Sequence, residues 1–583
     1  MTMELTGINA SPGVASGSAY LLSPRQLPEP TVYPSPPGLE TERLSQAITA
    51  AVVQLEDIQR SLSSSAGDSA AHIFRSQQTI LEDPALVGEV TAVIHQEHIC
   101  AEGALRRVVD QYRLLFLQLQ EDAYNRERVA DLDDVYQRLL RNLLGVKEAT
   151  LLTIPAQSIV VAVDLLPSDT ALVDPSLLKG LVLEGGAATS HVAILARNLG
   201  IPMVVQAAGA LEKISPGSEV VLDALDSERA TVVVHPNAEQ LRRCRSRVDL
   251  MTRRREVLAR YAGAEAVTRD GHRLSLSANV GATGDLAPAR RDGATRVGLY
   301  RSEFLFLRAA TPPTEDEQYQ AYRTAAELFP QGGAVIRTLD AGGDKPVQGL
   351  SLTREANPFL GARGLRLSLT HPEFFRAQLR AILRAAVHGP LQIMFPMVGG
   401  VPDLEAALAI LDEVREELDT GGVVYNRDVT VGAMIEVPSA ALVAEALARR
   451  VSFLSIGTND LTQYLTATDR LNGAVQEYYR VYDPSVFRTI RMVVDAGHRV
   501  GCQVGVCGEL GGNPLAIPAL VGMRVDELSM GASSLATAAW LVREGSYSDM
   551  QELSAAVLQQ EDHRVIRRLL EEYHEEQIRR SGL

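Results

Sequence analysis

This chain of 583 residues has few cysteines, no long apolar run and no secretion-signal pattern, and each absence excludes a class of protein. The 4 cysteines include no CxxC pair, which argues against a structural zinc site or a disulfide framework and fits a reducing compartment. No run of about 18 uncharged apolar residues occurs, so no membrane span is expected. The first residues, MTMELTG, lack the basic and apolar pattern of a secretion signal. We therefore expect a cytoplasmic protein without a membrane partner.

Basic residues are also in deficit. Lys and Arg total 56 against 72 Asp and Glu, which gives a formal net charge of −16. This balance argues against nucleic acid as a partner and allows steered attraction of a basic protein, although an acidic surface can equally serve solubility alone. With 46% hydrophobic residues, the chain can build buried cores, and its length predicts about three or four domains.

The order of sequence patterns predicts a multidomain α/β protein. Short apolar runs between residues 158 and 234 indicate a compact α/β domain, to which residues 1–20 add a candidate strand. A proline-rich stretch at 24–37 and a helical pattern from about 40 to 144 interrupt that domain. We expect four parts: an α/β domain (1–22 and 148–235), an inserted helical bundle (23–147), a long basic linker helix (236–262) and a C-terminal domain (263–583).

The C-terminal part repeats strand, loop and helix. We count eight apolar runs separated mostly by helical stretches, which predicts a (β/α)₈ TIM barrel with a loop insert after the third run. The runs are RLSLSANV, TRVGLYR, AVIRTLD, LQIMFPM, TVGAMIEV, SFLSIG, QVGVCGE and RVDELSM.

A glycine loop and a short helix surround one histidine in the α/β domain. The stretch GGAATSHVAILARNLGIP places cap-type residues before an apolar-periodic run and ends it with Gly200 and Pro202. His191 is therefore expected in the first helical turn, beside free N–H groups and the positive end of the helix dipole. An imidazole there could carry a phosphoryl group, or could simply help to cap the helix.

Charged and nucleophilic residues follow the predicted barrel strands, where the chemistry of such barrels gathers. Arginine forks match phosphate and carboxylate oxygens, and two carboxylates facing a phosphorylated substrate suit Mg²⁺. A thiol in that setting could protonate a carbanion. Each residue alone could instead form an ion pair or fill the core, but together they imply a small phosphorylated carboxylate as the substrate. The residues are Arg301, Arg337, Arg363, Glu436, Asn459, Asp460, Arg470 and Cys507.

These motifs, in this order and spacing, resemble the enzyme I family of the bacterial sugar phosphotransferase system, the phosphoenolpyruvate–protein phosphotransferases. The resemblance runs nearly end to end and includes GGAATSHVAILARNLGIPMVV, GLYRSEFLFL, RTLDAGGDKP, NPFLGARGLR, IGTNDLTQYLTATDR and VCGELGG. It implies a swivelling phosphohistidine domain with an inserted helical bundle. It also implies transfer of a phosphoryl group from phosphoenolpyruvate to the protein and on to the phosphocarrier protein HPr or an HPr-like carrier, for sugar uptake and phosphorylation.

The resemblance also implies residue roles. His191 matches the phosphorylated histidine, Thr170 a threonine that contacts it, and Cys507 the acid that protonates the enolate. Glu436 and Asp460 match Mg²⁺ ligands. Further matches are to residues that bind phosphoenolpyruvate: Arg301, Arg337, Arg363, Asn459, Asp460 and Arg470. The family's barrel forms a homodimer, and a swing between two docked states would use residues 236–262 as part of the hinge.

The sequence departs from the family pattern at two positions. Two other functions are also considered. Ala187 replaces the second glycine of the histidine loop, and Ser302 replaces a threonine while keeping the hydroxyl. A dikinase or synthase would need a nucleotide-binding ATP-grasp domain, which is not evident in the sequence. A regulatory phospho-relay or docking protein on the same fold, serving a non-transport carrier, would be favoured by loss of His191, Glu436, Asp460 or Cys507, all of which are present.

Overall fold

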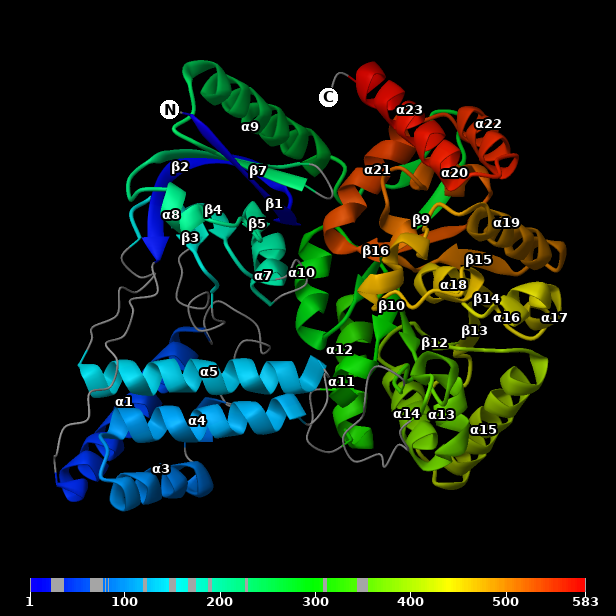
Figure 1. Cartoon of the computed structure of the whole chain (residues 1–583). Coiled ribbons are helices and arrows are strands. Elements are labelled where there is room, and N and C mark those ends of the chain that lie inside the picture. The colour runs from blue at the N-terminus through cyan, green and yellow to red at the C-terminus, as the bar shows by residue number, and fades with distance from the viewer. Residues whose placement is uncertain are drawn as a thin grey trace. The chain divides into compact units, whose positions relative to one another are not determined.

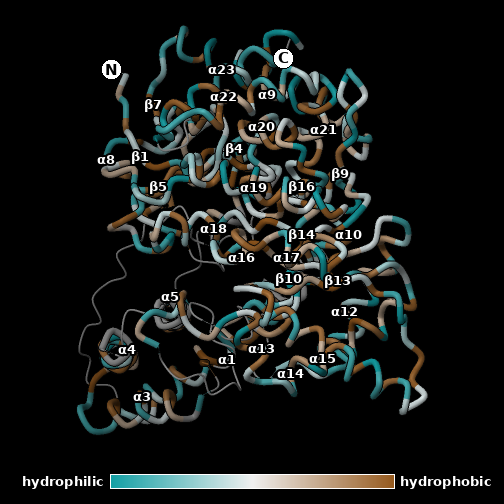
Figure 2. The backbone as a smooth tube through the Cα atoms, turned by 90° about the vertical axis from the view of Figure 1, so that its right-hand side faces the viewer, coloured by the Kyte–Doolittle hydropathy of each residue, from teal (hydrophilic) through white to brown (hydrophobic). Residues whose placement is uncertain are grey.

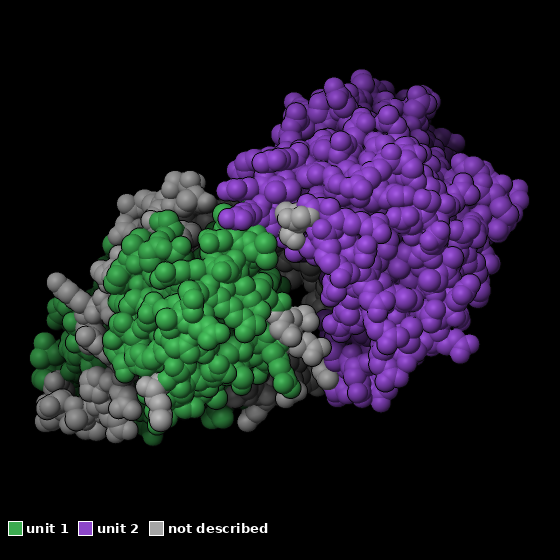
Figure 3. Space-filling model, turned by 90° about the horizontal axis from the view of Figure 1, so that it is seen from above, with its two compact units in different colours: residues 1–252 green, residues 253–583 purple. Residues whose placement is uncertain are grey.

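The chain forms two compact units, residues 1–252 and 253–583 (Figure 3). In this computed structural model the described residues are 2–22, 36–62, 77–78, 80–81, 83–118, 123–145, 154–165, 175–186, 191–225, 229–307, 312–342 and 355–581. The division between the units falls within one long helix, α9 (Ala238–Ala259), close to the linker helix expected over 236–262. The finer division into four domains stays a prediction.

A closed barrel of mixed strands organises part of the first unit (Figure 1). Its strand order is β1-β5-β4-β3-β2-β6-β7, with the parallel pairs β2–β3, β3–β4 and β4–β5 and antiparallel pairs elsewhere. Aliphatic side chains such as Ile159, Val161, Val182 and Val204 are fully buried in its core. The strands are β1 (Met3–Ser11), β2 (Gly13–Leu22), β3 (Ser158–Ala162), β4 (Leu178–Leu183), β5 (Met203–Val205), β6 (Glu219–Ala224) and β7 (Arg229–Val234).

The sequence predicted one strand within residues 1–20, and the structure has two. β2 corresponds to the expected strand, whereas β1 was missed because MELTGINAS has no sustained apolar alternation. β1 is held by its neighbours instead, pairing antiparallel with β7 from Met3 to Ile8 and with β5 beyond it. That pairing closes the barrel.

The helix that begins at His191 is present as expected. α7 (His191–Leu199) buries Val192, Ala193 and Ala196. Gly200 follows with φ +67°, and the Ile201 N–H donates to the Ala196 carbonyl, which ends the helix. Two short elements complete this region, η2 (Pro175–Leu177) and α8 (Ala210–Lys213).

Between β2 and β3 the described residues contain four long helices, as the helical pattern predicted. They are α1 (Pro37–Leu62), α3 (Pro84–Glu97), α4 (Ala101–Gln118) and α5 (Ala123–Leu144). Their apolar faces share one core that includes Leu55, Ile94 and Val108. Asp83 caps α3 by accepting from the Ala85 N–H at 2.9 Å.

The second unit contains the expected eight-stranded parallel barrel. The order is β10-β11-β12-β13-β14-β15-β16-β9, closed by the β10–β9 pair, and β8 (Ala266–Val267) adds to β9 antiparallel. All eight predicted apolar runs are strands of this barrel. They are β9 (Arg273–Val280), β10 (Val297–Arg301), β11 (Ala334–Arg337), β12 (Leu391–Phe395), β13 (Thr430–Ile435), β14 (Phe453–Ile456), β15 (Gln503–Val506) and β16 (Glu527–Gly531).

Helices connect and cover these strands, and hydrophilic and hydrophobic residues alternate along them (Figure 2). None of the helices in the described part of the chain is both long enough and apolar enough to span a membrane. The helical elements are η3 (Thr283–Asp285), α10 (Leu286–Arg291), α11 (Glu303–Leu307), α12 (Glu315–Leu328), η4 (Pro358–Leu360), α13 (Leu365–Thr370), α14 (Pro372–Ala385), α15 (Val401–Thr420), α16 (Pro438–Leu442), α17 (Ala444–Ala448), α18 (Thr458–Leu465), η5 (Gly473–Tyr478), α19 (Pro484–Arg499), η6 (Glu509–Gly512), α20 (Ile517–Gly522), η7 (Ala532–Ser534), α21 (Leu535–Glu544), α22 (Tyr547–Leu558) and α23 (His563–Ser581).

Candidate active site

The candidate site lies at the carboxyl ends of the barrel strands. Inside the barrel, Leu299, Val335, Met394, Met434 and Cys507 form one apolar cluster. Because side chains alternate along a strand, the residues two positions beyond Leu299, Val335 and Met434 share the same inward face. Those residues are Arg301, Arg337 and Glu436. The strands therefore place charged groups directly above an apolar floor.

Arg337 is held between two buried carboxylates. It ends β11, pairs with Glu303 at the start of α11, and lies with Nη1 3.0 Å from Oδ2 of Asp340. All three residues are at most 7% exposed. Burial alone would lower the pKa of Arg337, but the two carboxylates raise it above its ordinary value, so the guanidinium stays charged.

Arg363 extends this network toward the next carboxylate. Its Nη2 lies 3.2 Å from Asp340 Oδ1 and its Nη1 3.2 Å from Asp460 Oδ1. Arg470 approaches the same Asp460 oxygen at 3.8 Å. Charges of alternating sign thus run from Glu303 to Arg470 across the barrel mouth. Buried ion pairs of this kind are costly to assemble, which points to a functional purpose rather than stability.

Glu436 is a further buried carboxylate of this site. It follows β13, is 1% exposed, and accepts from the Met397 N–H at 2.6 Å. Burial first, and then the charges of Asp460 and Asp340, raise the pKa of Glu436 to about 8, against the opposing effect of the arginines. Gly457 makes room for it, because a Cβ there would lie 2.7 Å from Oε2.

The donor set of Glu436 and Asp460 fits a divalent cation. Two buried carboxylates repel each other unless a cation lies between them, and Mg²⁺ accepts such oxygens while leaving further positions for substrate and water. Within the described residues no cluster of three or more His, Cys, Asp or Glu side chains has metal-binding geometry. The pair therefore suits a metal that shares its coordination with a bound substrate.

A second loop contact joins the ends of β14 and β15. Asn459 Oδ1 accepts from the Glu509 N–H at 2.9 Å, and the Tyr479 hydroxyl donates to the Asn459 carbonyl at 3.1 Å. Gly508 permits this approach, since a Cβ there would lie 2.5 Å from Thr458 N. These contacts fix the start of α18, where Asp460 lies.

Cys507 is a buried thiol at this same end of the barrel. It is 3% exposed, and its carbonyl accepts from Asn279 Nδ2 at 3.0 Å. Burial is the main cause that raises the pKa of Cys507 to about 11, and the charge of Glu436 adds to it, while Arg337 and Arg301 lower it. The thiol therefore keeps its proton near neutral pH, as a proton donor requires.

The structure brings together the predicted site residues of the second unit from the ends of five strands and one long loop: Arg301, Arg337, Arg363, Glu436, Asn459, Asp460, Arg470 and Cys507. His191 begins α7, but its side chain lies outside the described residues, as does Thr170. Two tyrosines of the site were missed: Tyr464, whose hydroxyl accepts from Arg363 Nη1 at 3.5 Å, and Tyr479, which contacts Asn459. Each follows the sixth run, but an isolated tyrosine in a helix or loop gives no sequence signal of its own.

Family models match the chain in the same order as its parts. The "PEP-utilising enzyme, N-terminal" model covers residues 6–128, the "PEP-utilising enzyme, mobile domain" model 154–226, and the "PEP-utilising enzyme, PEP-binding domain" model 255–546. The fold and the site thus define a PEP-utilising enzyme.

Curated relatives narrow the class. Three proteins named phosphoenolpyruvate-protein phosphotransferase are similar over almost the whole chain. That of Lactococcus lactis subsp. cremoris is 40% identical over 96% of this chain and 97% of its own. That of Enterococcus faecalis is 39% identical over 96% and 98%, and that of Bacillus subtilis 38% identical over 95% and 97%. The chain belongs to the phosphoenolpyruvate-protein phosphotransferase family.

Proposed function

We propose that this protein transfers the phosphoryl group of phosphoenolpyruvate to His191, releases pyruvate, and passes the group to a histidine of HPr or an HPr-like carrier for sugar uptake. The observation that carries this proposal is the run of charges from Glu303 to Arg470 above the apolar barrel floor, in which every side chain but the half-buried Arg470 is buried. A dianionic phosphate and a carboxylate need such fixed cations, and phosphoryl transfer asks mainly for positioning and charge neutralisation.

The arginines bind the substrate. The oxygens of phosphoenolpyruvate accept hydrogen bonds from Arg301, Arg337, Arg363 and Arg470. Asn459 also contacts the phosphate. The existing carboxylate partners hold the guanidinium groups of Arg337 and Arg363 in place before substrate arrives, so little reorganisation is needed.

Glu436 and Asp460 would hold Mg²⁺. When bound, the ion neutralises charge on the phosphate oxygens and orients the substrate. The raised pKa of Glu436 fits a carboxylate that becomes ionised when a cation is present.

The transfer breaks the bond between phosphorus and the enol oxygen and forms a bond between phosphorus and a ring nitrogen of His191. The electron pair stays on the leaving enolate, and the Cys507 thiol donates its proton to the methylene carbon to give pyruvate. The thiolate then recovers a proton from solvent. Thr170 contacts His191 or its phosphoryl group.

His191 belongs to the first unit and the substrate residues to the second. We therefore include in the proposal a swing between two docked states, with residues 236–262 as part of the hinge. A cytoplasmic location, docking of the carrier on the inserted helical bundle and a homodimer formed by the barrel complete it.

Labelled phosphoenolpyruvate with Mg²⁺ tests the proposal. The full chain should acquire an acid-labile, base-stable label that is absent from His191→Ala. An intact protein that takes no label would favour the regulatory docking function instead. Transfer from the loaded protein to candidate carriers then identifies the partner.

A further inference from the structure

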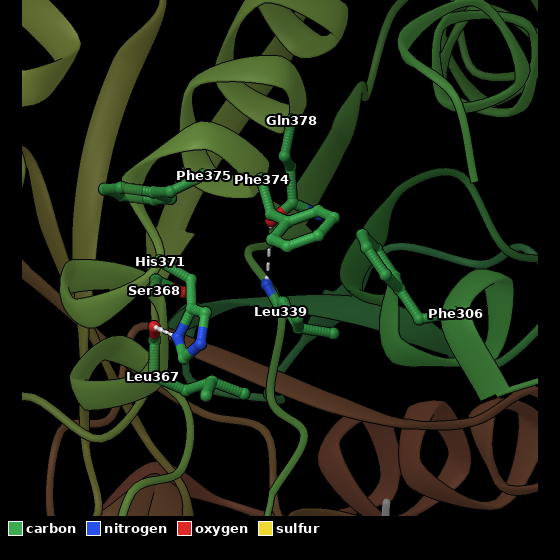
Figure 4. Close-up of a pocket in the computed structure, with 8 residues that line it drawn as sticks. All are labelled: Phe306, Leu339, Leu367, Ser368, His371, Phe374, Phe375 and Gln378. Carbon is green, nitrogen blue, oxygen red and sulfur yellow. Dashed lines mark hydrogen bonds between the residues drawn. The ribbon is translucent and has the colours of Figure 1, made fainter. Parts of the chain in front are cut away.

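One buried amide connects two of the strand ends that form the candidate active site. Gln378 lies on α14 and is 1% exposed. Its Oε1 accepts from the Leu339 N–H at 2.8 Å, and its Nε2 donates to Ser302 Oγ at 3.0 Å and to the Tyr322 hydroxyl at 2.9 Å. Figure 4 shows the bond to Leu339.

Both anchors of Gln378 lie beside proposed substrate residues. Ser302 stands between Arg301 and Glu303, after β10. Leu339 stands between Arg337 and Asp340, after β11. A single side chain therefore bridges the two loops whose charged groups pair with one another across the barrel mouth.

Gln378 supplies the acceptor for a backbone N–H just beyond the end of β11. β11 ends at Arg337, so the Leu339 N–H lies beyond the strand ladder and needs a side-chain acceptor. The small cavity beside Gln378 is lined largely by apolar side chains, among them Phe306, Leu367 and Phe374 (Figure 4). The hydroxyl that Ser302 keeps is used in this buried network.

Tyr322 fixes the amide from the other side. Its hydroxyl donates to Gln318 Oε1 at 3.2 Å, and burial raises its pKa far above the ordinary value, so the phenol stays neutral. The Gln378 amide is therefore held on three sides by α12 and by the ends of β10 and β11. Such a fully bonded buried amide specifies one geometry.

We infer that Gln378 is a positioning residue for phosphoenolpyruvate binding: it sets the spacing between the ends of β10 and β11, and hence between Arg301 and Arg337. This inference rests on the proposed function. Gln378 touches no reacting atom, and its effect passes through Ser302 and Leu339.

The test compares steady-state kinetics of the full chain with Gln378→Met, which keeps the volume and removes all three hydrogen bonds. A displacement of about 1 Å in a binding group can cost up to about 10²-fold, so we expect the KM for phosphoenolpyruvate to rise about tenfold. A merely structural role would reduce the amount of folded enzyme, which lowers kcat per total protein and leaves KM unchanged. That second result would overturn the inference, as would unchanged KM and kcat.

Gln577→Met is the matched control. Gln577 is 5% exposed on α23 and donates to the Leu541 carbonyl at 2.7 Å, so its loss removes a buried amide of the same residue type away from the strand ends. Its KM should stay within about twofold of wild type, even if the loss of this hydrogen bond lowers thermal stability.

Ser302→Ala keeps the test decisive if Gln378→Met fails to fold. It removes one anchor, and its KM should rise about threefold, with an unchanged KM counting against the inference. The wild-type assay distinguishes failure of the proposed function from failure of the positioning role of Gln378. A wild type without turnover overturns the proposed function. An active wild type, together with an unaltered KM in the variants, overturns the positioning role alone.

Discussion

The two ends of the eight-stranded barrel both carry polar groups, yet they are built differently. At the amino ends, Glu527 accepts from Ser277 Oγ at 2.5 Å and pairs with Arg296 at 3.5 Å, with the charged side chains 24% and 30% exposed. At the carboxyl ends, the side chains of Arg337 and Glu303 are 8% and 1% exposed. A polar barrel interior is thus not itself a site. What distinguishes the carboxyl end is the burial of several charges, whose desolvation is compensated only by one another.

The largest contrast should come from removing one arginine at each end. Arg337→Met leaves Glu303 and Asp340 without this partner and removes a proposed phosphate contact, so kcat/KM for phosphoenolpyruvate should fall about 10³-fold. Arg296→Met should keep kcat/KM within about threefold, because Arg296 precedes β10 at the opposite end of the barrel from the proposed substrate residues. Similar losses for both variants would remove the distinction between the two ends.

The two buried cysteines of the second unit offer the next contrast. Cys507→Ala should bind phosphoenolpyruvate but form pyruvate about 10²-fold more slowly, because general acid catalysis is lost. Cys502→Ala deletes a thiol of similar burial, 5% exposed against 3%, and should keep the rate. Rapid-quench measurement of pyruvate checks both, and near-normal pyruvate formation by Cys507→Ala would remove its proposed role.

Two glycines at the carboxyl end of the barrel, Gly508 and Gly531, differ in how closely other atoms pack against them. Gly508→Ala places a Cβ 2.5 Å from Thr458 N and should shift the start of α18, lowering kcat/KM about tenfold. Gly531→Ala meets nothing within 4 Å and should behave as wild type. Equal activity of the two variants would show that the approach of the β15 loop to α18 has no part in positioning Asp460.

Removing the charge of Glu527, at the amino ends of the barrel strands, should lower stability without lowering activity. Glu527→Gln weakens its bonds to Ser277 and Arg296, and should lower the free energy of unfolding by about 1 kcal/mol, with kcat/KM within about twofold. Urea unfolding and steady-state kinetics measure the two quantities. A loss of activity larger than the loss of folded protein would count against a structural role for this end.

The smallest expected effect concerns the Cys507 thiol, which should not ionise near neutral pH. Because burial raises the pKa of Cys507 to about 11, the neutral thiol is the favoured form at physiological pH. Its contribution to stability is present below the ordinary thiol pKa and is lost as the pH rises through about 11. The ultraviolet absorbance of thiolate, wild type minus Cys507→Ala, should appear only near that value. A signal that rises at the ordinary pKa of about 8.5 would contradict the burial argument.

The barrel was predictable because eight short segments rich in apolar residues, from RLSLSANV at β9 to RVDELSM at β16, recur along the chain with helical stretches between most of them. The site residues were predictable where they follow such runs, as Arg337 and Glu436 do. The bridging role of Asp340, which joins Arg337 to Arg363, depends on the fold, because Arg363 comes from a loop whose path no local pattern fixes. Gln378 gave no signal, since a glutamine in an amphipathic helix is usually solvated.

Exchange of labelled pyruvate into phosphoenolpyruvate, measured with the full chain and Mg²⁺ in the absence of any carrier, tests the central claim most directly. The account predicts exchange by the wild type and by Arg296→Met, exchange about 10³-fold slower by Arg337→Met, and none by His191→Ala. Exchange that persists in His191→Ala would place the phosphoryl acceptor elsewhere and contradict the account.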